Sequence, residues 1–223
     1  MRDYLKRQEQ LFTEKQQQRL EKLKVMIAGT GGLGTNQALQ LQRIGVQKIY
    51  LYDYDQVEIT NLNRQLCYGR KDIGRPKVEA AAEFLKQFDL ETEITAVNEK
   101  ISLATEIPKD IDIIFDGMDN FESRFILDQL ALENELPFIH AGIEQFFAQI
   151  MLVLPESKLR LKDVFAGSAK KEIPAVFSPA VTVTASIQVL EALKYLLRFD
   201  NYLKDQLLHI DLISSQMEKI QLK

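Results

Sequence analysis

Short apolar runs alternate with helically spaced apolar positions over the first two thirds of the chain. Residues 24–28 and 47–52 are strand-sized apolar stretches, and residues 33–44 between them have the spacing of a helix that packs on one face. The same pattern predicts strands at 93–97, 111–115 and 137–141 and helices at 76–88 and 121–134. Strands that alternate with helices predict a parallel, doubly wound sheet.

The pattern changes after residue 142. The apolar stretch 145–154 follows 138–143 without room for a crossover helix, which favours an antiparallel pair. Proline-containing residues 155–179 predict a long mobile loop. A buried helix around Val189 and a closing hairpin over 207–222 follow. The predicted fold is α/β: a Rossmann-like doubly wound sheet, parallel in the N-terminal part, with antiparallel strands in the C-terminal part.

The first 22 residues differ from the rest, because Gln, Lys, Arg and Glu dominate and few apolar side chains are present to bury. This composition predicts a mostly solvated N-terminal helical arm over 1–22, of a kind that often needs a partner surface. We expect one domain over 1–223, with the arm followed by a βαβ part at 23–142 and an antiparallel part at 143–223.

Composition restricts the possible partners and compartment. Twenty-eight basic and 32 acidic residues give a net charge of −4, so there is no overall basic field for nucleic acid or an anionic membrane. The one cysteine, Cys67, cannot form an intramolecular disulfide, and charged side chains such as Arg2 and Lys6 interrupt any apolar signal segment. No apolar run approaches the roughly 18 residues needed to span a bilayer. We therefore expect a cytoplasmic protein.

A glycine-rich loop follows the first predicted strand and indicates a nucleotide site. Its glycines are Gly29, Gly31, Gly32 and Gly34. Three of them have the GxGxxG spacing, which permits a tight turn and a close approach of backbone to ligand. Asp53 ends the next strand, where a carboxylate accepts hydrogen bonds from a ribose hydroxyl. This combination suits NAD and ATP equally, and the alternative is that Asp53 is a turn residue beside Asp55.

Polar donors gather after the second strand. Asn61, Arg64 and Gln65 lie in a segment with too many donors for a core, and such donors suit phosphate oxygens. Lys77 begins a helix, where the helix dipole disfavours a cation, and it could neutralise charge on a phosphoanhydride under attack. The alternatives are a surface turn and a solvated lysine.

Two aspartates follow the strand at 111–115, at the sheet edge where open α/β folds bind ligands. Asp116 and Asp119 are the first and fourth residues of the sequence Asp-Gly-Met-Asp-Asn, and one of them could hold magnesium, which takes one or two carboxylates together with substrate phosphates. The alternative is that Asp119 or Asn120 caps the next helix.

Taken in order, the motifs resemble those of the ThiF/MoeB/HesA family, relatives of the ubiquitin-activating enzymes. The motifs that carry the resemblance are Gly-Thr-Gly-Gly-Leu-Gly34, Asp53 with Asp55, Asn61-Leu-Asn-Arg-Gln65, Gly74-Arg-Pro-Lys77 and Asp116-Gly-Met-Asp-Asn120. The resemblance spans residues 4–213 approximately. It implies ATP- and Mg²⁺-dependent adenylation of the C-terminal glycine carboxylate of a small ubiquitin-like sulfur-carrier protein of the ThiS/MoaD type, with release of pyrophosphate.

The resemblance also implies a role for each motif. Asp53 would hold the ribose, Asp119 would bind magnesium, and Arg7 would reach the partner subunit's ATP in a homodimer. The residues implied to bind and polarise the phosphates are Asn61, Arg64, Gln65 and Lys77. Phe146, Phe147, Ile150 and Met151 are candidates for part of the surface that receives the carrier tail, although strand alternation cannot expose all four on one face.

The chain departs from many members of this family in its thiols. A single cysteine excludes a four-thiolate zinc site, so no zinc is expected, and residues 155–179 contain no cysteine for a covalent link to the carrier. We expect adenylation without a covalent intermediate, with Cys67 a buried small hydrophobe and with His140 and His209 structural. Two alternatives remain: an NAD-dependent oxidoreductase, which would give Lys77 and Asp119 no role, and a non-catalytic family member that binds nucleotide or carrier.

Overall fold

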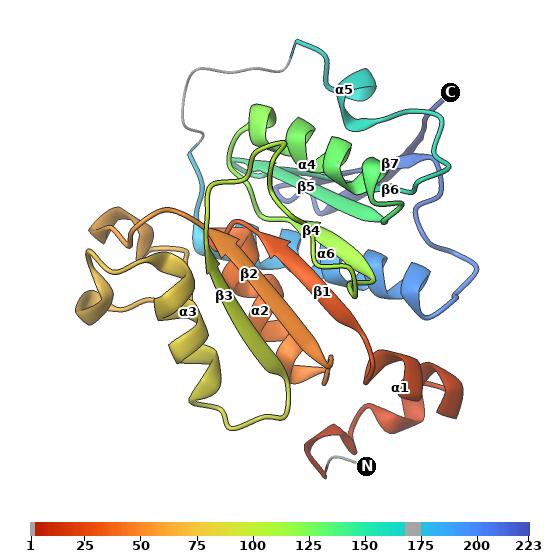
Figure 1. Ribbon diagram of the computed structural model, residues 1–223. Coiled ribbons are helices and arrows are strands. Elements are labelled where there is room, and N and C mark those ends of the chain that lie inside the picture. Colours follow the sequence, from red (N-terminus) through yellow and green to blue (C-terminus); the bar gives the residue numbers. More distant parts are fainter. Residues whose placement is uncertain (1–2, 168–174) are drawn as a thin grey trace.

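An eight-stranded sheet forms the centre of the molecule in the computed structural model, which describes residues 3–167 and 175–223 (Figure 1). The strand order is β3-β2-β1-β4-β5-β6-β7-β8. The strands are β1 (Lys24–Ala28), β2 (Lys48–Asp53), β3 (Glu93–Asn98), β4 (Ile113–Asp116), β5 (Phe138–Glu144), β6 (Phe147–Val153), β7 (Gln206–Asp211) and β8 (Gln216–Gln221). The first five in this order pair in parallel and the last three are antiparallel, which confirms the predicted fold.

Helices cover both faces of the sheet, because successive side chains of each central strand point to opposite sides. In β1, Val25 and Ile27 belong to one buried cluster and Met26 and Ala28 to the other. The first cluster is closed by α2 (Gly32–Arg43), α3 (Lys77–Lys86) and α6 (Ser178–Leu196), and the second by α4 (Phe121–Glu133) and the short α5 (Leu161–Val164). The molecule therefore has three layers, with two hydrophobic cores (Figure 1).

The strand order reverses between β1 and β4, and this point organises the site. From β1 the chain continues through β2 to β3 on one side, whereas β4 and β5 lie on the other. The amide of Gly29 donates to Tyr52 at the end of β2, and the amide of Gly117 donates to Ala28 at the end of β1. The carboxyl ends of the three strands thus converge at a topological switch point, where open α/β sheets bind ligands.

The N-terminal arm packs on its own chain more closely than the sequence predicts. It forms the 3₁₀ helices η1 (Asp3–Leu5) and η2 (Glu9–Leu11) and the helix α1 (Glu14–Leu20). Leu5 and Leu20 are fully buried, whereas Leu11 is 71% exposed. Gln8 donates from Nε2 to the carbonyl of Ile44 at the C-terminal end of α2. Two buried leucines and this bond fix the arm at the opposite end of α2 from the glycine loop.

The region predicted as one long loop contains structure at both ends. The helix α5 lies in it and buries Leu161 completely, because the Leu161 amide and Arg160 both donate to the Asp128 side chain of α4. The helix α6 begins at Ser178, inside the predicted loop, while residues 168–174 lie outside the described part of the chain. The predicted hairpin is confirmed as β7 and β8, with Ser215 in its turn at a positive φ of 59°.

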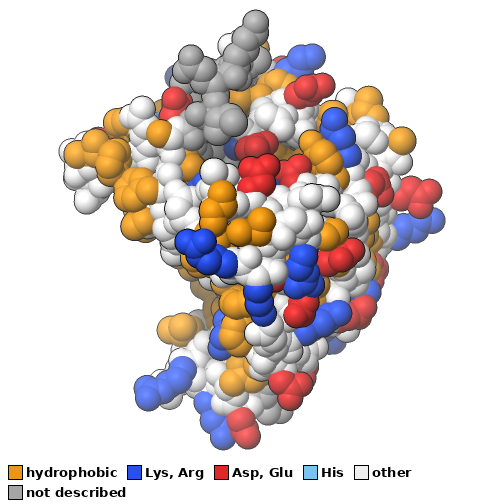
Figure 2. Space-filling view, turned by 90° about the vertical axis from the view of Figure 1, so that its left-hand side faces the viewer, with side chains coloured by type: hydrophobic (Ala, Val, Ile, Leu, Met, Phe, Trp, Pro, Cys, Tyr) orange, Lys and Arg blue, Asp and Glu red, His pale blue; other side chains and the backbone are white. Residues whose placement is uncertain are grey.

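Charges of both signs lie on the surface. Figure 2, viewed from the side that carries α3, shows basic and acidic side chains interspersed over that face instead of separated by sign. Two further 3₁₀ turns, η3 (Ile59–Asn61) and η4 (Arg70–Asp72), precede α3. Among residues 3–167 and 175–223, no helix is long and apolar enough to cross a membrane.

Candidate functional site

The glycine loop at the end of β1 is held by close backbone packing. Gly29 has a φ of +90°, and a Cβ added there would lie 2.6 Å from the carbonyl oxygen of Gly117. A Cβ on Gly34 would lie 1.8 Å from the carbonyl oxygen of Gly29. Side chains are therefore excluded at both positions by the turn after β4 and by the loop itself. The structure joins two predicted motifs that are far apart in the sequence.

Gly31 differs from these two positions, because a Cβ added there would make no close contact with any described residue. A Cβ on Gly31 would find its nearest neighbour at 3.7 Å, the Nε2 of Gln65. Gly31 and Gly32 lie at the N-terminus of α2, which has no side-chain cap and no acidic residue in its first turn. The first amides of such a helix lack internal partners and attract an anion such as phosphate. The space beside Gly31 thus suits a phosphate group.

Asp53 both shapes the loop and retains capacity for a ligand. Its Oδ2 accepts from the amide and the hydroxyl of Thr30 at 2.7 and 3.0 Å, and its Oδ1 accepts from the amide of Asp55 at 2.9 Å. An ionised carboxylate has about four lone-pair sites, so these three donors leave room for a ribose hydroxyl. The alternative of a turn aspartate and the predicted ribose role are therefore compatible.

The segment with Arg64 and Gln65 lies against the glycine loop, as its predicted role requires. The Cγ of Arg64 would be 3.5 Å from a Cβ on Gly32, and its guanidinium donates to the carbonyl of Thr60 and to Asn63. Gln65 is only 4% exposed, and its Oε1 is buried without a hydrogen-bond partner among the described residues. A buried unsatisfied polar atom beside an uncapped helix end points to a polar ligand or to water at this place.

Asn61 has a local task in the same segment. It is buried, and its Oδ1 accepts from the amide of Glu58, which caps the short turn η3. This bond occupies the side-chain oxygen of Asn61. The contact of Asn61 with phosphate stays a prediction.

Lys77 is not a solvated surface lysine, because it is 7% exposed. Its Nζ forms an ion pair of 2.8 Å with Oδ2 of Asp55, and its amide donates to the Asp55 carbonyl. The hydroxyl of Tyr68 connects this helix start to the glycine loop, since it contacts the carbonyl oxygens of Thr30 at 2.8 Å and Lys77 at 3.2 Å. A buried cation is therefore held by Asp55 at the start of α3, and Tyr68 connects this helix start to the glycine loop.

The turn at residues 116–120 places one aspartate inside and one outside. Asp116 is completely buried, whereas Asp119 is exposed and its Oδ1 accepts from the side-chain amide of Asn120 at 3.1 Å. Asn120 caps α4 by accepting from the amide of Ser123, so Asp119 is not the cap. No group of three or more His, Cys, Asp or Glu side chains suits a metal within the described ranges. Magnesium held by one carboxylate and nucleotide phosphates needs no such group, and Asp119 fits it.

Two buried neighbours of this turn were not assigned to the site from the sequence, from which His140 was expected to be structural. His140 lies with Nδ1 at 2.6 Å from Oδ2 of Asp116, and Arg124 has Nε at 3.2 Å from the same oxygen. Burial lowers the pKa of His140, although the hydrogen bond to Asp116 opposes this shift. The neutral ring donates from Nδ1, because a carboxylate only accepts. The pairing of β5 beside β4 was the available signal, since it places His140 near the end of β4.

Arg7 and Cys67 lie outside this constellation. Arg7 is exposed on the arm, at the far end of α2. Cys67 is buried, and burial raises the pKa of its thiol to about 12. A thiol that remains protonated is a poor nucleophile, so Cys67 behaves as a small hydrophobe.

Together, the fold and the site define a doubly wound α/β protein with a glycine-loop anion site at its switch point. The ThiF family model matches residues 5–223, and the chain belongs to this family. The resemblance inferred from the motifs is thereby confirmed.

Two curated relatives and one solved structure illustrate the similarity. The sulfur carrier protein ThiS adenylyltransferase of Bacillus subtilis is 32% identical over 188 residues, which cover 81% of this chain and 56% of that protein. The molybdopterin-synthase adenylyltransferase of Haemophilus influenzae is 32% identical over 214 residues, covering 92% and 88%. The crystal structure of E. coli MccB with AMPCPP and MccA has a TM-score of 0.82 at 23% identity, covering 93% and 66%, and shares the fold. The chain thus spans little more than half of the Bacillus protein.

Proposed function

We propose that this protein is an ATP-dependent adenylyltransferase that activates the C-terminal glycine carboxylate of a small ubiquitin-like sulfur-carrier protein of the ThiS/MoaD type. The printed names of two relatives, a ThiS adenylyltransferase and a molybdopterin-synthase adenylyltransferase, support this class. The observation that carries the proposal is the buried Lys77 beside the glycine loop. A nicotinamide oxidoreductase gives such a cation no role, and family membership does not favour it.

The reaction joins two anions, so charge neutralisation and positioning dominate catalysis. A carboxylate oxygen of the carrier attacks the α-phosphorus of ATP, the bond to the bridging oxygen breaks, and pyrophosphate leaves with the released electron pair. Asp53 holds the ribose, and the N-terminus of α2 with Asn61, Arg64 and Gln65 holds the phosphates. Lys77 moves from Asp55 toward the phosphates as charge develops. Asp119 would hold magnesium, which would supply further neutralisation of the phosphate charge.

Arg7 acts in this proposal from a second copy of the chain. The helix α2 has 12 residues, and at 1.5 Å per residue it separates the arm from the glycine loop by about 18 Å. The arm is fixed at the C-terminal end of α2 by the bond from Gln8 to Ile44, so Arg7 cannot reach the loop of its own chain. A two-fold axis across α2 places two copies of the helix antiparallel. Each arm then lies near the glycine loop of the other copy.

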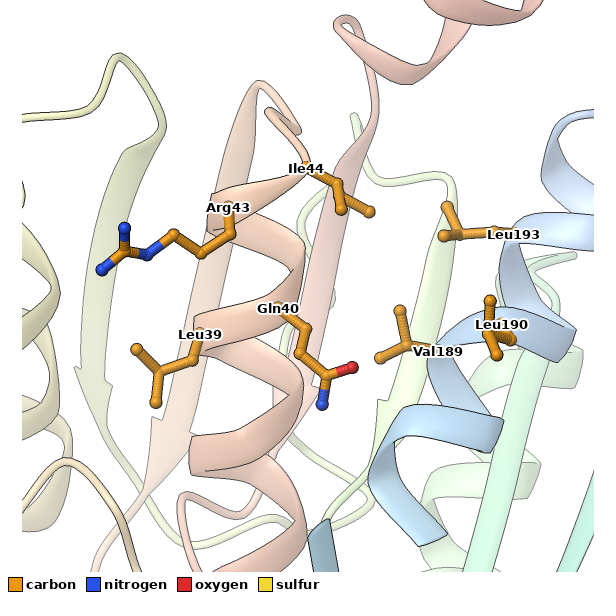
Figure 3. A pocket seen from close by; sticks show the side chains of 7 residues that line it. All are labelled: Leu39, Gln40, Arg43, Ile44, Val189, Leu190 and Leu193. Atoms are coloured by element: carbon orange, nitrogen blue, oxygen red, sulfur yellow. The ribbon is translucent and has the colours of Figure 1, made fainter. Parts of the chain in front are cut away.

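An apolar groove between α2 and α6 is the surface we assign to the second copy. Figure 3 shows Gln40 of α2 and Ile44, the residue after α2, facing Val189 and Leu193 of α6. Leu190 is 56% exposed at its edge. The groove is continuous with the arm, because Ile44 both lines it and accepts the bond from Gln8. One symmetric contact would cover the groove and deliver Arg7, which argues for a copy of this chain as the occupant.

The carrier tail approaches, in this proposal, past the turn between β5 and β6. Phe146 and Phe147 are exposed there, and the ring of Phe146 lies 4.9 Å from that of Phe177. Ile150 and Met151 are buried in the two cores and are the members of this group that belong to the core, as strand alternation requires. Their strand positions alternate between the two cores, and helices cover both faces there.

An ATP–pyrophosphate exchange assay tests the activity. Labelled pyrophosphate should enter ATP only when a carrier ending in Gly-Gly is present, and a carrier without its last glycine is the matched control. The absence of exchange with every ThiS- or MoaD-type carrier would overturn the enzyme assignment. Melting shifts with ATP and Mg²⁺ but not NAD, in a protein without exchange, would instead identify a non-catalytic nucleotide-binding member.

Mixing two inactive variants tests the dimer. In a heterodimer of Arg7→Ala and Lys77→Ala, one site has its own Lys77 and receives Arg7 from the other subunit. Random mixing should therefore restore about a quarter of the wild-type rate. No restoration in a mixture shown to exchange subunits would mean that Arg7 does not act in trans.

A further inference from the structure

We propose that Arg124 and His140 are positioning residues that hold the turn at 116–120 and thereby fix Asp119 for metal binding. This inference rests on the proposed function, in which Asp119 holds magnesium. Neither side chain contacts the predicted ligand positions: Arg124 is 7% exposed and His140 is completely buried. Their effect is exerted through Asp116 and the backbone of Met118.

Met118, the residue before Asp119, is held by hydrogen bonds at both its amide and its carbonyl. Its amide donates to Oδ1 of Asp116 at 2.8 Å, and its carbonyl accepts from Nη2 of Arg124 at 2.8 Å. Both bonds come from side chains with little freedom to move. Because Asp119 follows directly in the chain, the position of its carboxylate depends on this fixed peptide.

The Asp116 carboxylate is itself held in place. Its second oxygen faces Nδ1 of His140 at 2.6 Å and Nε of Arg124 at 3.2 Å. Arg124 thus contacts both the carboxylate and the peptide that the carboxylate binds. The planar guanidinium presents donors in a fixed geometry, which a lysine cannot reproduce.

Two sets of neighbouring side chains, one of glutamines and one of phenylalanines, surround this cluster. The carbonyl of Asp116 accepts from the side-chain amides of Gln37 on α2 and Gln188 on α6 at 3.0 Å each. The ring of His140 lies 5.3 Å from that of Phe165, and Phe121 covers the guanidinium of Arg124 at 5.0 Å. The charge of Arg124 is balanced by Asp116, while the imidazole supplies a neutral donor. The cluster therefore positions a residue without adding net charge to the site.

Four substitutions test the inference. Arg124→Gln removes the charge and the fork, and Arg124→Lys keeps the charge alone. His140→Phe removes the donor, whereas His140→Asn places an amide nitrogen near the position of Nδ1. The matched control is Arg160→Gln, which breaks the other ion pair of α4, with Asp128, away from the turn.

The readouts are the Mg²⁺ concentration for half-maximal exchange and, independently of activity, Mn²⁺ binding in the presence of a non-hydrolysable ATP analogue, followed by electron paramagnetic resonance. Arg124→Gln, Arg124→Lys and His140→Phe should each weaken metal binding about tenfold or more, since loss of the groups that orient metal ligands costs roughly 10- to 100-fold in metal affinity. His140→Asn should recover most of the loss. Arg160→Gln should lower stability and leave the metal dependence unchanged.

Equal metal dependence in Arg124→Gln and Arg160→Gln would overturn the inference, because the cluster would then serve stability alone. Unchanged Mn²⁺ binding in Asp119→Asn, or no Mn²⁺ binding by the wild-type protein with the analogue, would also overturn it. If the wild-type protein lacks exchange but Mn²⁺ binding depends on Asp119 and Arg124, the adenylyltransferase proposal fails and the positioning role stands.

Discussion

The two turns that face each other at the switch point are fixed by different means. The glycine loop after β1 is held by backbone packing, with a Cβ on Gly34 excluded at 1.8 Å. The turn after β4 is held by buried charge, with Asp116 between Arg124 and His140. Steric exclusion does not change with pH or charge state, whereas an ion-pair cluster does. The phosphate side of the site is therefore rigid by shape, and the metal side is rigid by electrostatics.

A substitution in the glycine loop should have the largest effect on the free energy of unfolding. Gly34→Ala places a methyl group on the Gly29 carbonyl, and since backbone cannot yield locally we expect a loss of more than about 4 kcal/mol of unfolding free energy. Gly31→Ala, whose Cβ has 3.7 Å of space, should change stability by less than about 1 kcal/mol and weaken ATP binding. Urea denaturation and calorimetric titration measure the two effects. Equal stability losses would show that the loop is not held by packing.

Removing the buried charge of Asp116 in the turn after β4 should have the next largest effect on the free energy of unfolding. Asp116→Asn leaves Arg124 buried without a counter-charge, which costs about 3–5 kcal/mol. The same substitution three residues later, Asp119→Asn, alters an exposed side chain and should change stability by less than about 0.5 kcal/mol. Chemical denaturation of both variants provides the comparison. A mild effect of Asp116→Asn would mean that the turn does not depend on buried charge.

A polar contact on the glycine side should contribute less. Tyr68→Phe removes the hydroxyl that contacts the carbonyl oxygens of Thr30 and Lys77, for a loss of about 1 kcal/mol. Tyr54→Phe, at a tyrosine that is 54% exposed, is the control and should be neutral. If Tyr68→Phe destabilised the protein as much as Asp116→Asn, hydrogen bonding instead of packing would hold the glycine side.

The smallest effect on stability is expected from a change of pH. It should act on the turn after β4 through His140 and should not act on the glycine loop. Burial lowers the pKa of His140 below its ordinary value of 6.5, so the unfolded chain binds this proton first as the pH falls. Stability should therefore decline as the pH drops below 6.5 toward the folded-state pKa, and the contribution is fully present above 6.5. Denaturation midpoints at pH 7.5 and 5.5 should differ less for His140→Asn than for the wild-type protein. An identical pH dependence would exclude His140 as its source.

The sequence predicted the sheet and most of its helices because their signals are local. The apolar run at 24–28 became β1 with the predicted bounds, and the missing crossover after 138–143 correctly indicated an antiparallel pair. The arm and α5 were less well predicted. Their burial depends on single contacts with distant segments, such as the bond from Gln8 to Ile44, and periodicity in a window of sequence carries no such information.

The site divides in the same way. Glycines and strand-end aspartates can be recognised by residue type and spacing, and Gly29, Gly34 and Asp53 were predicted in this way. The structure places these three residues together. Arg124 and His140 have no local signal. They meet Asp116 only because β4 pairs with β5 and α4 returns over the turn. Buried charge is thus the part of the site that sequence patterns did not reveal.

The mutual contact of Gly29 and Gly117 has a consequence for inheritance and design. Each occupies the space that a side chain on the other would need, since their added Cβ atoms lie 2.6 and 2.4 Å from the opposite carbonyl oxygen. A hybrid chain joined anywhere between residues 30 and 116 takes these two positions from different parents. Such a chimera keeps the close contact between the two turns only where both parents carry glycine at positions 29 and 117. The two positions must therefore be exchanged together.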